Sequence, residues 1–199
     1  ELKDLCFPNI RESGHKHNFN FLVMNIYGLS VHSVCKAQKL PINITFPICY
    51  KMFTVISTLH KNGYIHRDIK PSNFLFQLSK TDQLVLIDFG LALEYIDHET
   101  GLVIEYEQTK FAGTKKYASY YAHKYTQLGR RDDLISWLYS SIEIISGTLP
   151  WSNSEDENEI ILLKDSISPE DLCKDVPAIF RKIFKYLLTL SQTDAPSYV

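Results

Sequence analysis

The spacing of apolar side chains along the chain predicts two long helices in its core. One runs from about Ile44 to Lys61 and carries a single apolar stripe, formed by Ile48, Met52, Val55, Ile56 and Leu59. Pro47 fits the first turn of this helix, and Gly63 fits its end. The other covers residues 132 to 146 and has so little polar face that we expect it to be buried.

Weaker apolar patterns predict further, shorter helices. They cover Leu29 to Lys39, Glu159 to Lys164, the residues after Ser168, and a last amphipathic segment with Ile179, Ile183, Phe184, Leu187 and Leu188. Ser168 is a good helix cap, because a proline and two acidic residues follow it. Residues 1 to 19 show no clear period, and residues 91 to 112 are polar and mixed, which predicts a long mobile loop.

Short apolar runs predict buried strands at four places. They are Phe21 to Met24, Tyr64-Ile65, Phe74 to Phe76, and Leu84 to Ile87. Because these runs are short and the helical patterns are long, we expect a mixed chain that is mainly helical.

Bulk composition limits the classes of protein to which this chain can belong. Its 199 residues suggest one domain or one large lobe of a bigger domain, and 45% hydrophobic residues can bury a substantial core. The formal net charge of −2 gives no overall basic field, so we expect neither nucleic acid nor a membrane as a partner.

The cysteines point to a reducing compartment. The chain has Cys6, Cys35, Cys49 and Cys173, and no two of them form a C-x-x-C pair. This pattern predicts reduced thiols in the core of a cytoplasmic or nuclear protein. No apolar run approaches membrane-spanning length, and no signal peptide is visible. Because the chain starts with Glu1 rather than methionine, we expect it to be a fragment.

An unusually charged loop lies between the second and third apolar runs. Asp68 and Asn73 are five residues apart with Lys70 between them, and Asp88 follows the fourth run. Asp88 and Asn73 can supply oxygen ligands to metal ions, and Asp68 can accept the proton of an attacking hydroxyl. Lys70 can stabilise a transferred phosphoryl group, so the loop suits phosphoryl transfer. The alternative is a polar hairpin whose Asp and Asn side chains only form turns.

The order and spacing of these residues resemble the eukaryotic protein kinases. His66-Arg67-Asp68-x-x-x-x-Asn73 resembles their catalytic loop, and Asp88-Phe89-Gly90 resembles their metal-binding motif. Lys70, two residues after Asp68, resembles the serine/threonine-kinase form. The resemblance implies an α+β fold, namely a mainly helical C-terminal lobe with short strands around the catalytic cleft. It also implies transfer of the γ-phosphate of ATP to serine or threonine hydroxyls of a protein substrate.

Further segments resemble the casein kinase 1 superfamily. Ala118-Ser119 stands near where a typical kinase has Ala-Pro-Glu, a motif that this superfamily also lacks. Arg130-Arg131-Asp132-Asp133-Leu134 and Gly147-Thr148-Leu149-Pro150-Trp151 resemble the superfamily as well. Tyr117-Ala118-Ser119 followed by Ala122-His123-Lys124 resembles its tau-tubulin kinase branch.

The resemblance implies a catalytic role for each matching residue. Asp68 would orient and deprotonate the substrate hydroxyl, and Lys70 would stabilise the transferred phosphoryl group. Asn73 and Asp88 would hold Mg²⁺, and Asn73 would also count as a catalytic residue. Thr114 would form a hydrogen bond near Asp68 and help to seat the substrate.

The resemblance also implies which residues contact ATP. Met24 would be the gatekeeper behind the adenine site, and backbone groups of Asn25 and Tyr27 would face adenine. Leu75 and Ile87 would contribute further contacts with the nucleotide.

Four more residues receive roles from the resemblance. His66 and Arg67 would shape the catalytic loop, and Asp133 would accept backbone hydrogen bonds from it, since a buried carboxylate must be paired. The alternative for Asp133 is an exposed first-turn acid that interacts with the helix dipole. Lys116 matches a basic residue that helps bind anions, which would favour acidic or already phosphorylated substrates. The alternative for Lys116 is a solvated surface lysine.

Parts of a kinase have no match in the sequence. No residue matches the Gly-rich phosphate loop, the strand lysine that holds the α- and β-phosphates, or the glutamate that pairs with it. We therefore expect residues 1–199 to be a partial kinase domain, with the hinge, the C-terminal lobe and a truncated last helix, and to be inactive alone. The alternative is a non-catalytic scaffold derived from a kinase, against which the retained Asp68, Asn73 and Asp88 argue.

Overall fold

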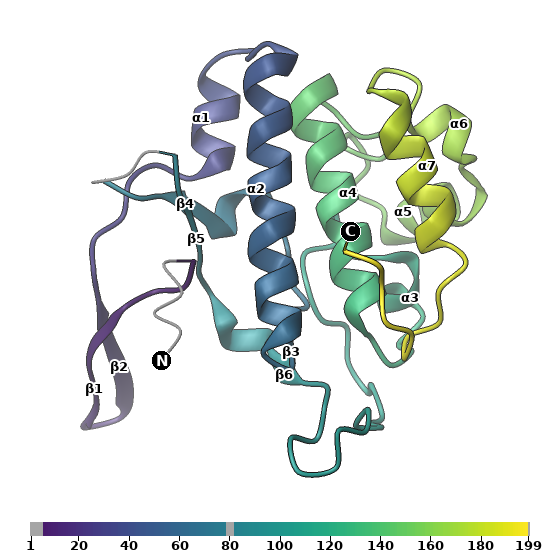
Figure 1. Ribbon diagram of the computed structural model, residues 1–199. Helices are drawn as coiled ribbons and strands as arrows, with labels where there is room; N and C mark the ends of the chain where they lie inside the picture. The colour runs from purple at the N-terminus through teal and green to yellow at the C-terminus, as the bar shows by residue number, and fades with distance from the viewer. Residues whose placement is uncertain (1–5, 79–81, 199) are drawn as a thin grey trace.

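The computed structural model describes residues 6–78 and 82–198, which form a mainly helical body with small sheets (Figure 1). The α-helices are α1 (Val31–Ala37), α2 (Ile42–Lys61), α3 (Tyr120–His123), α4 (Arg130–Ser146), α5 (Glu157–Ser166), α6 (Pro169–Leu172) and α7 (Ala178–Leu187). The strands are β1 (Ile10–Lys16), β2 (Phe19–Met24), β3 (Tyr64–Ile65), β4 (Phe74–Phe76), β5 (Leu84–Leu86) and β6 (Leu93–Glu94). Short 3₁₀ helices are η1 (Pro71–Asn73) and η2 (Phe89–Leu91). The predicted α+β class is confirmed.

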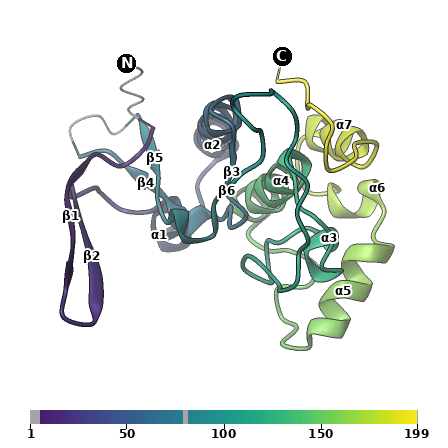
Figure 2. The ribbon, with the colours of Figure 1, turned by 90° about the horizontal axis from the view of Figure 1, so that it is seen from below.

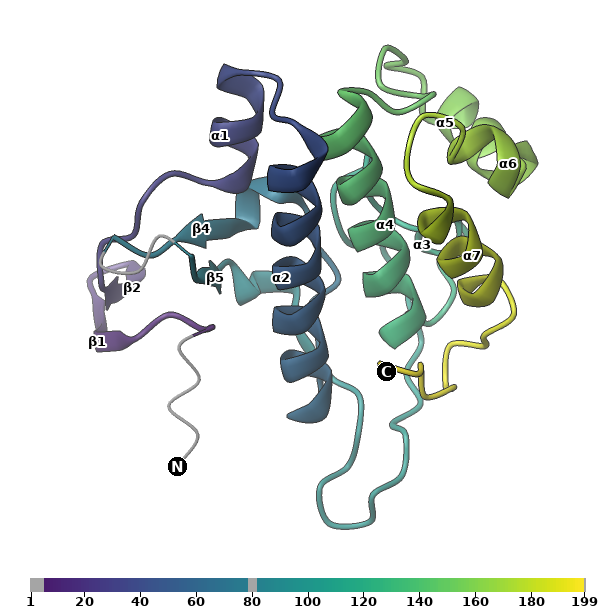
Figure 3. The same cartoon turned by 45° about the horizontal axis from the view of Figure 1, so that its top comes forward.

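Helices α2 and α4 lie side by side at the centre of the molecule (Figure 3). Helix α7 packs against α4, whereas β5 packs against α2, and α1 contacts β4. The main hydrophobic core lies between these elements and includes Met52 and Ile56 of α2 and Leu138 and Tyr139 of α4, each at most 1% exposed. The prediction of two core helices is confirmed.

The start of α2 differs from the prediction. The helix begins at Ile42, two residues early, so Pro47 lies inside it rather than in its first turn. Proline there removes the hydrogen bond to the carbonyl of Asn43. Both residues are exposed, so water can supply the hydrogen bond that this carbonyl loses. The end is as predicted, with Gly63 at φ +86° just beyond the last turn.

By length and composition, α2 is also apolar enough to cross a membrane, with a mean hydropathy of 1.3. The prediction that no apolar run approaches such a length was therefore wrong for this helix. A core helix can have the same composition, and the stripe of α2 lies in the core, where Met52, Val55 and Ile56 are buried.

Two small antiparallel sheets hold the ends of the charged loop. Strand β3, before the loop, pairs with β6, and β4, after the loop, pairs with β5. The segment that follows β2 is attached to β4, because Gly28 N donates to Phe76 O at 2.7 Å and Phe76 N donates to Leu29 O at 3.0 Å. The strands predicted at these places are confirmed.

The burial predicted for β2 was wrong. This strand pairs with β1, which the sequence pattern did not predict, and Leu22 and Val23 are 52% and 42% exposed. The β1–β2 hairpin stands apart from the helices (Figure 2), so within the described residues neither face of the hairpin is covered by another layer. A two-stranded sheet cannot bury an apolar run by itself.

Two further predictions meet the structure only in part. The described residues form no disulfide, but of the cysteines only Cys49 and Cys173 are buried, while Cys6 and Cys35 are half-buried. The segment from 91 to 112 is mostly a loop, but it contains β6, which has too few residues to show a period.

Candidate active site

The loop from His66 to Lys70 has an unusual backbone shape. Arg67 has a φ of 66°, a left-handed conformation that costs free energy for a residue other than glycine. Ile69 is 1% exposed and anchors the loop in the core. Because such a conformation persists only where its surroundings hold it, the contacts of the loop matter.

Asp133 of α4 supplies the main contacts beneath this loop. Its Oδ2 accepts a hydrogen bond from His66 N at 2.6 Å, and its Oδ1 accepts one from Arg67 N at 2.8 Å. His60 Nε2 also lies 3.0 Å from Oδ2. Burial alone would raise the pKa of Asp133, but the hydrogen bonds and electrostatic interactions with His60 and His66 outweigh burial and lower that pKa. Asp133 is therefore an ionised acceptor at neutral pH.

His66 connects the loop to the end of β5. Its ring is fully buried, with Nε2 3.1 Å from the carbonyl oxygen of Ile87 and Nδ1 3.3 Å from the amide nitrogen of Asp68. The tautomer with hydrogen on Nε2 satisfies both contacts, because Nε2–H then donates and Nδ1 accepts. The ring also packs edge-on against Phe89. His66 thus fixes the backbone of Asp68 relative to the peptide before Asp88.

Asp68 lies at the centre of a cluster of three side chains. Lys70 Nζ donates to its Oδ2 at 2.6 Å, and Thr114 Oγ1 donates to its Oδ1 at 2.7 Å. Lys70 Nζ also donates to Thr114 Oγ1 at 2.9 Å, which closes the triangle. The side chains of Lys70 and Asp68 are 21% and 10% exposed, so the cluster is open to solvent on one side.

Thr114 reaches this cluster because a glycine precedes it. Gly113 has a φ of +112°, and a Cβ there would lie 2.7 Å from the carbonyl oxygen of Arg67. Any side chain would therefore push this segment away from the loop at 66–70.

Asn73 and Asp88 lie at the same end of the β4–β5 hairpin. Asn73 Nδ2 donates to the carbonyl oxygen of Asp68 at 2.9 Å, and Ile87 N donates to the carbonyl oxygen of Asn73 at 2.9 Å. Asp88 comes next, is exposed, and has a left-handed φ of 67°. Asn73, at the end of η1, therefore connects the loop of Asp68 to the segment that carries Asp88.

The oxygens of Asn73 and Asp88 fit a magnesium ion that is shared with phosphates. Mg²⁺ at nucleotide sites usually takes one or two carboxylates together with substrate phosphate oxygens. Residues 6–78 and 82–198 contain no group of three His, Cys, Asp or Glu side chains that could hold a metal ion. Asn73 and Asp88 offer an amide oxygen and a carboxylate, the types of donor that such a site uses.

The residues predicted to contact the nucleotide lie on neighbouring segments. Met24 ends β2 and is 37% exposed, and Asn25 and Tyr27 follow it on the segment attached to β4. Strand β4 carries Leu75, and Ile87 follows β5, both half-buried. In the described part of the chain, no hydrogen bond joins these five side chains to the Asp68 cluster.

Lys116 already has a carboxylate partner. Its ammonium forms an ion pair with Oε1 of Glu143, and its side chain is 33% exposed. Tyr117 Oη donates to Oε2 of the same carboxylate at 2.6 Å. Burial, with Glu143 nearby, raises the pKa of Tyr117, so the phenol stays a donor. Any anion that binds Lys116 has to compete with Glu143.

A sequence comparison decides the family. A family model described as the protein kinase domain matches residues 9–194. This chain belongs to the protein kinase family. This kinase chain is also similar to a probable serine/threonine-protein kinase of Dictyostelium discoideum, with 37% identity over 191 residues. The match covers 94% of this chain and 39% of that relative. The chain thus spans well under two thirds of the length of this relative.

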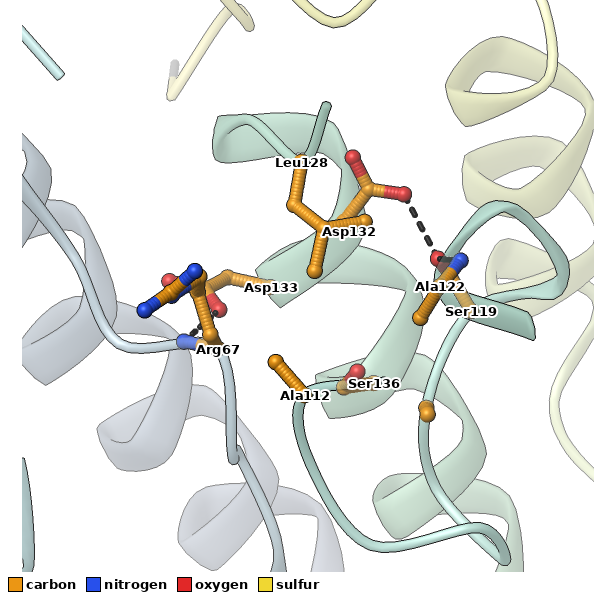
Figure 4. Close-up of a pocket in the computed structure, with 9 residues that line it drawn as sticks. Arg67, Ala112, Ser119, Ala122, Leu128, Asp132, Asp133 and Ser136 are labelled. Carbon is orange, nitrogen blue, oxygen red and sulfur yellow. Dashed lines mark hydrogen bonds between the residues drawn. The ribbon is translucent and has the colours of Figure 1, made fainter. Parts of the chain in front are cut away.

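A small cavity lies behind the catalytic loop of this kinase chain (Figure 4). Its walls come from Arg67 of the loop, from the segment with Ser119, and from Asp132 and Asp133 of α4. Ser119 Oγ donates to Asp132 Oδ1 at 2.6 Å along one wall. Asp68 does not line this cavity, so it is separate from the predicted catalytic cleft.

The sequence analysis missed residues that support the candidate site of this kinase chain. His60 contacts Asp133 across 73 positions, and Glu143 contacts Lys116 across 27. Helical periodicity can place such residues on helices, but it carries no information about partners so far away in sequence. We find no local signal that would have identified either.

Proposed function

We propose that this chain supplies the catalytic loop of a serine/threonine protein kinase, which transfers the γ-phosphate of ATP to protein hydroxyls. The observation that carries the proposal is the carboxylate of Asp68, held between Lys70 Nζ at 2.6 Å and Thr114 Oγ1 at 2.7 Å. A reachable carboxylate beside a fixed cation suits phosphoryl transfer to a hydroxyl. The name of the 37% identical relative supports the same substrate class.

In the proposed reaction, the substrate hydroxyl oxygen bonds to the γ-phosphorus, and the bond from that phosphorus to the β,γ-bridging oxygen breaks. Asp68 accepts the hydroxyl proton, and ADP leaves with the bridging oxygen. Lys70 offsets the negative charge on the transferred phosphoryl oxygens. Thr114 keeps the carboxylate in one orientation through its hydrogen bond to Oδ1.

The proposal includes ATP and magnesium. Asn73 and Asp88 would hold magnesium, which offsets charge on the nucleotide phosphates when bound. His66, Arg67 and Asp133 would keep the loop in its catalytic shape through the hydrogen bonds described above. The adenine would contact the residues predicted from the sequence: Met24, Asn25, Tyr27, Leu75 and Ile87.

We also propose a finer classification. Residues 1–199 would be the hinge and larger lobe of a kinase of the casein kinase 1 superfamily, near its tau-tubulin kinase branch. The support is Ala118-Ser119 near the usual position of Ala-Pro-Glu, together with the segments at 130–134 and 147–151. The partner would be a protein substrate in the cytoplasm or nucleus, with no role for nucleic acid or a membrane.

Transfer of radiolabelled phosphate tests the proposed function. We expect the full-length gene product, with Mg²⁺ and ATP, to label serine and threonine of a mixed peptide library. Residues 1–199 alone should be inactive and bind ATP weakly, because no residue here matches the Gly-rich loop or strand lysine that position the phosphates. A well-folded but inactive full-length product would contradict the kinase proposal and favour a scaffold.

Substrate preference should depend on Lys116. In the full-length product, Lys116→Ala should weaken phosphorylation of a peptide that already carries a phosphate by about tenfold, the lower end for a charge-assisted hydrogen bond. A neutral peptide should lose less. Glu143→Gln should act in the opposite direction, because it removes the carboxylate that competes with the substrate anion. Steady-state kcat/KM for both peptides measures this, and equal losses on both peptides would contradict it.

A further inference from the structure

A buried lysine holds the segment that carries Thr114. Lys164 lies on α5 and is 5% exposed. Its Nζ donates to the carbonyl oxygens of Lys115 at 2.6 Å and of Ala118 at 2.7 Å. The third neighbour is Nε2 of His123, at 3.2 Å. An ammonium group has three N–H donors, and each of them has an acceptor here.

The protonation of His123 fits this arrangement. Its Nδ1 lies 3.4 Å from Oε1 of Glu157, so a hydrogen on Nδ1 leaves Nε2 free to accept from Lys164. Burial lowers the pKa of His123, and the charge of Lys164 lowers it further, so the ring is neutral at pH 7. The other carboxylate oxygen of Glu157 pairs with Lys115 Nζ at 2.7 Å.

Aromatic side chains complete the surroundings of the ammonium. The rings of Trp151 and Tyr139 lie 5.1 and 5.5 Å from Lys164 Nζ, where their faces attract a cation. Trp151 Nε1 also donates to the carbonyl oxygen of Lys116 at 2.8 Å. The carbonyls of residues 115, 116 and 118 are therefore all held by side chains from outside the segment.

The same segment reaches Asp68 at its other end. The carbonyl oxygen of Thr114 accepts from the amides of Tyr117 and Ala118, both at 2.9 Å, which closes a turn over residues 114–118. From this turn, Thr114 Oγ1 donates to Asp68. Lys164 holds the other end of this turn. A change at that end would therefore move the Thr114 hydroxyl, which orients the Asp68 carboxylate.

We propose that Lys164 is a positioning residue, which holds the turn at 114–118 in the shape that places Thr114 against Asp68. Its effect on catalysis rests on the proposed kinase function, whereas its effect on the turn does not. Burying an ammonium costs free energy unless its donors are satisfied. A lysine is used here because its three donors reach two carbonyls and an imidazole together, which an apolar side chain could not do.

Hydrogen exchange at single amides tests the proposal on residues 1–199. Lys164→Met, which keeps the length but has no donors, should lower the protection factors of Tyr117 and Ala118 about tenfold, as expected for a lost hydrogen bond. Lys164→Gln keeps two N–H donors and should lose less. The matched control is Lys185→Met on α7, an exposed lysine that pairs with Glu170, which should change neither amide.

Two outcomes would overturn the proposal. One is wild-type protection at Tyr117 and Ala118 in a folded Lys164→Met variant. The other is a loss of protection that is as large at Phe184 of α7 as in the turn, because it would show general destabilisation.

The wild-type protein offers a measurement that needs no substitution. Burial lowers the pKa of Lys164 to about 7, so Nζ loses one of its three donors as the pH rises through that value. The ionisable groups that face Lys164 Nζ are His123 of α3, Glu157 of α5 and Tyr139 of α4. Burial raises the pKa of Tyr139, and the hydrogen bond from Lys115 lowers the pKa of Glu157. Because the neutral amine still has two N–H donors for the two carbonyls, protection in the turn, corrected for intrinsic exchange, should fall with this deprotonation by less than in Lys164→Met, while α7 stays constant. A fall larger than that of Lys164→Met would contradict this assignment of the donors.

Catalysis gives a separate readout. In the full-length product, Lys164→Met should lower kcat about tenfold while KM for ATP stays unchanged, because the turn contacts Asp68 and not the nucleotide segments. Lys164→Gln should recover part of the loss. An inactive wild-type product would count against the proposed kinase function, but the exchange measurements would still decide the role of Lys164.

Discussion

Replacing Asp68 with asparagine should lower kcat of the full-length gene product by about 10²- to 10⁴-fold, the usual contribution of a general base. Asparagine has the same shape, but it cannot accept the hydroxyl proton. Its amide also cannot accept from both Lys70 and Thr114, as the carboxylate does at 2.6 and 2.7 Å. Phosphate transfer to a peptide at saturating ATP measures the change.

The interpretation of that loss depends on the fold being intact. Asp175→Asn is the matched control, because Asp175 is exposed and lies in the turn after α6, away from the site. It should leave kcat unchanged. Asp88→Asn should also abolish activity, since it removes the proposed magnesium carboxylate. A folded Asp68→Asn protein with wild-type kcat would contradict the assignment of the base.

Replacing Asp133 with alanine should lower the free energy of unfolding by about 3–5 kcal/mol, as expected when one partner of a buried polar network is removed. The main-chain N–H groups of His66 and Arg67 would lose their acceptor, and so would His60. Arg67 would also lose the contact that holds its left-handed backbone. Urea unfolding followed by circular dichroism measures the change.

The control for this variant is Asp175→Ala, which should leave the urea midpoint unchanged. The pH dependence gives a second check. The pKa of Asp133 is lowered in the folded state, so its contribution is present above the unfolded pKa of about 3.9 and is lost as pH falls through the folded value. The difference between wild type and Asp133→Ala should therefore shrink in acid. A similar unfolding free energy for both proteins at pH 7 would contradict the role of Asp133.

The α2 helix shows what hydrophobic periodicity can predict and what it cannot. Its stripe was predictable because side chains three and four positions apart share a face whatever the rest of the chain does. Its first residue was not, since proline favours the first turn of a helix, and only the structure shows that Pro47 lies further in, at an exposed position. The exposure of β2 was also unpredictable, because burial of a strand depends on the layers that pack on it.

The order and type of the residues in the motifs were enough to predict the α+β class and the membership of the protein kinase family, and hydrophobic periodicity predicted the core helices. The sequence also placed Asp68, Asn73 and Asp88 on loops next to short strands, because motif spacing is a local property. Only the tertiary structure revealed the ion pair of Lys116 with Glu143 and the burial of Lys164 among three acceptors. In sequence Lys164 looks like any lysine near a helix end. Its environment is set by side chains from α3 and α4, by the Trp151 ring and by main-chain carbonyl oxygens of the turn at 114–118. Such contacts arise only when distant segments pack together, and the free energy of burying a charge depends on all of them at once.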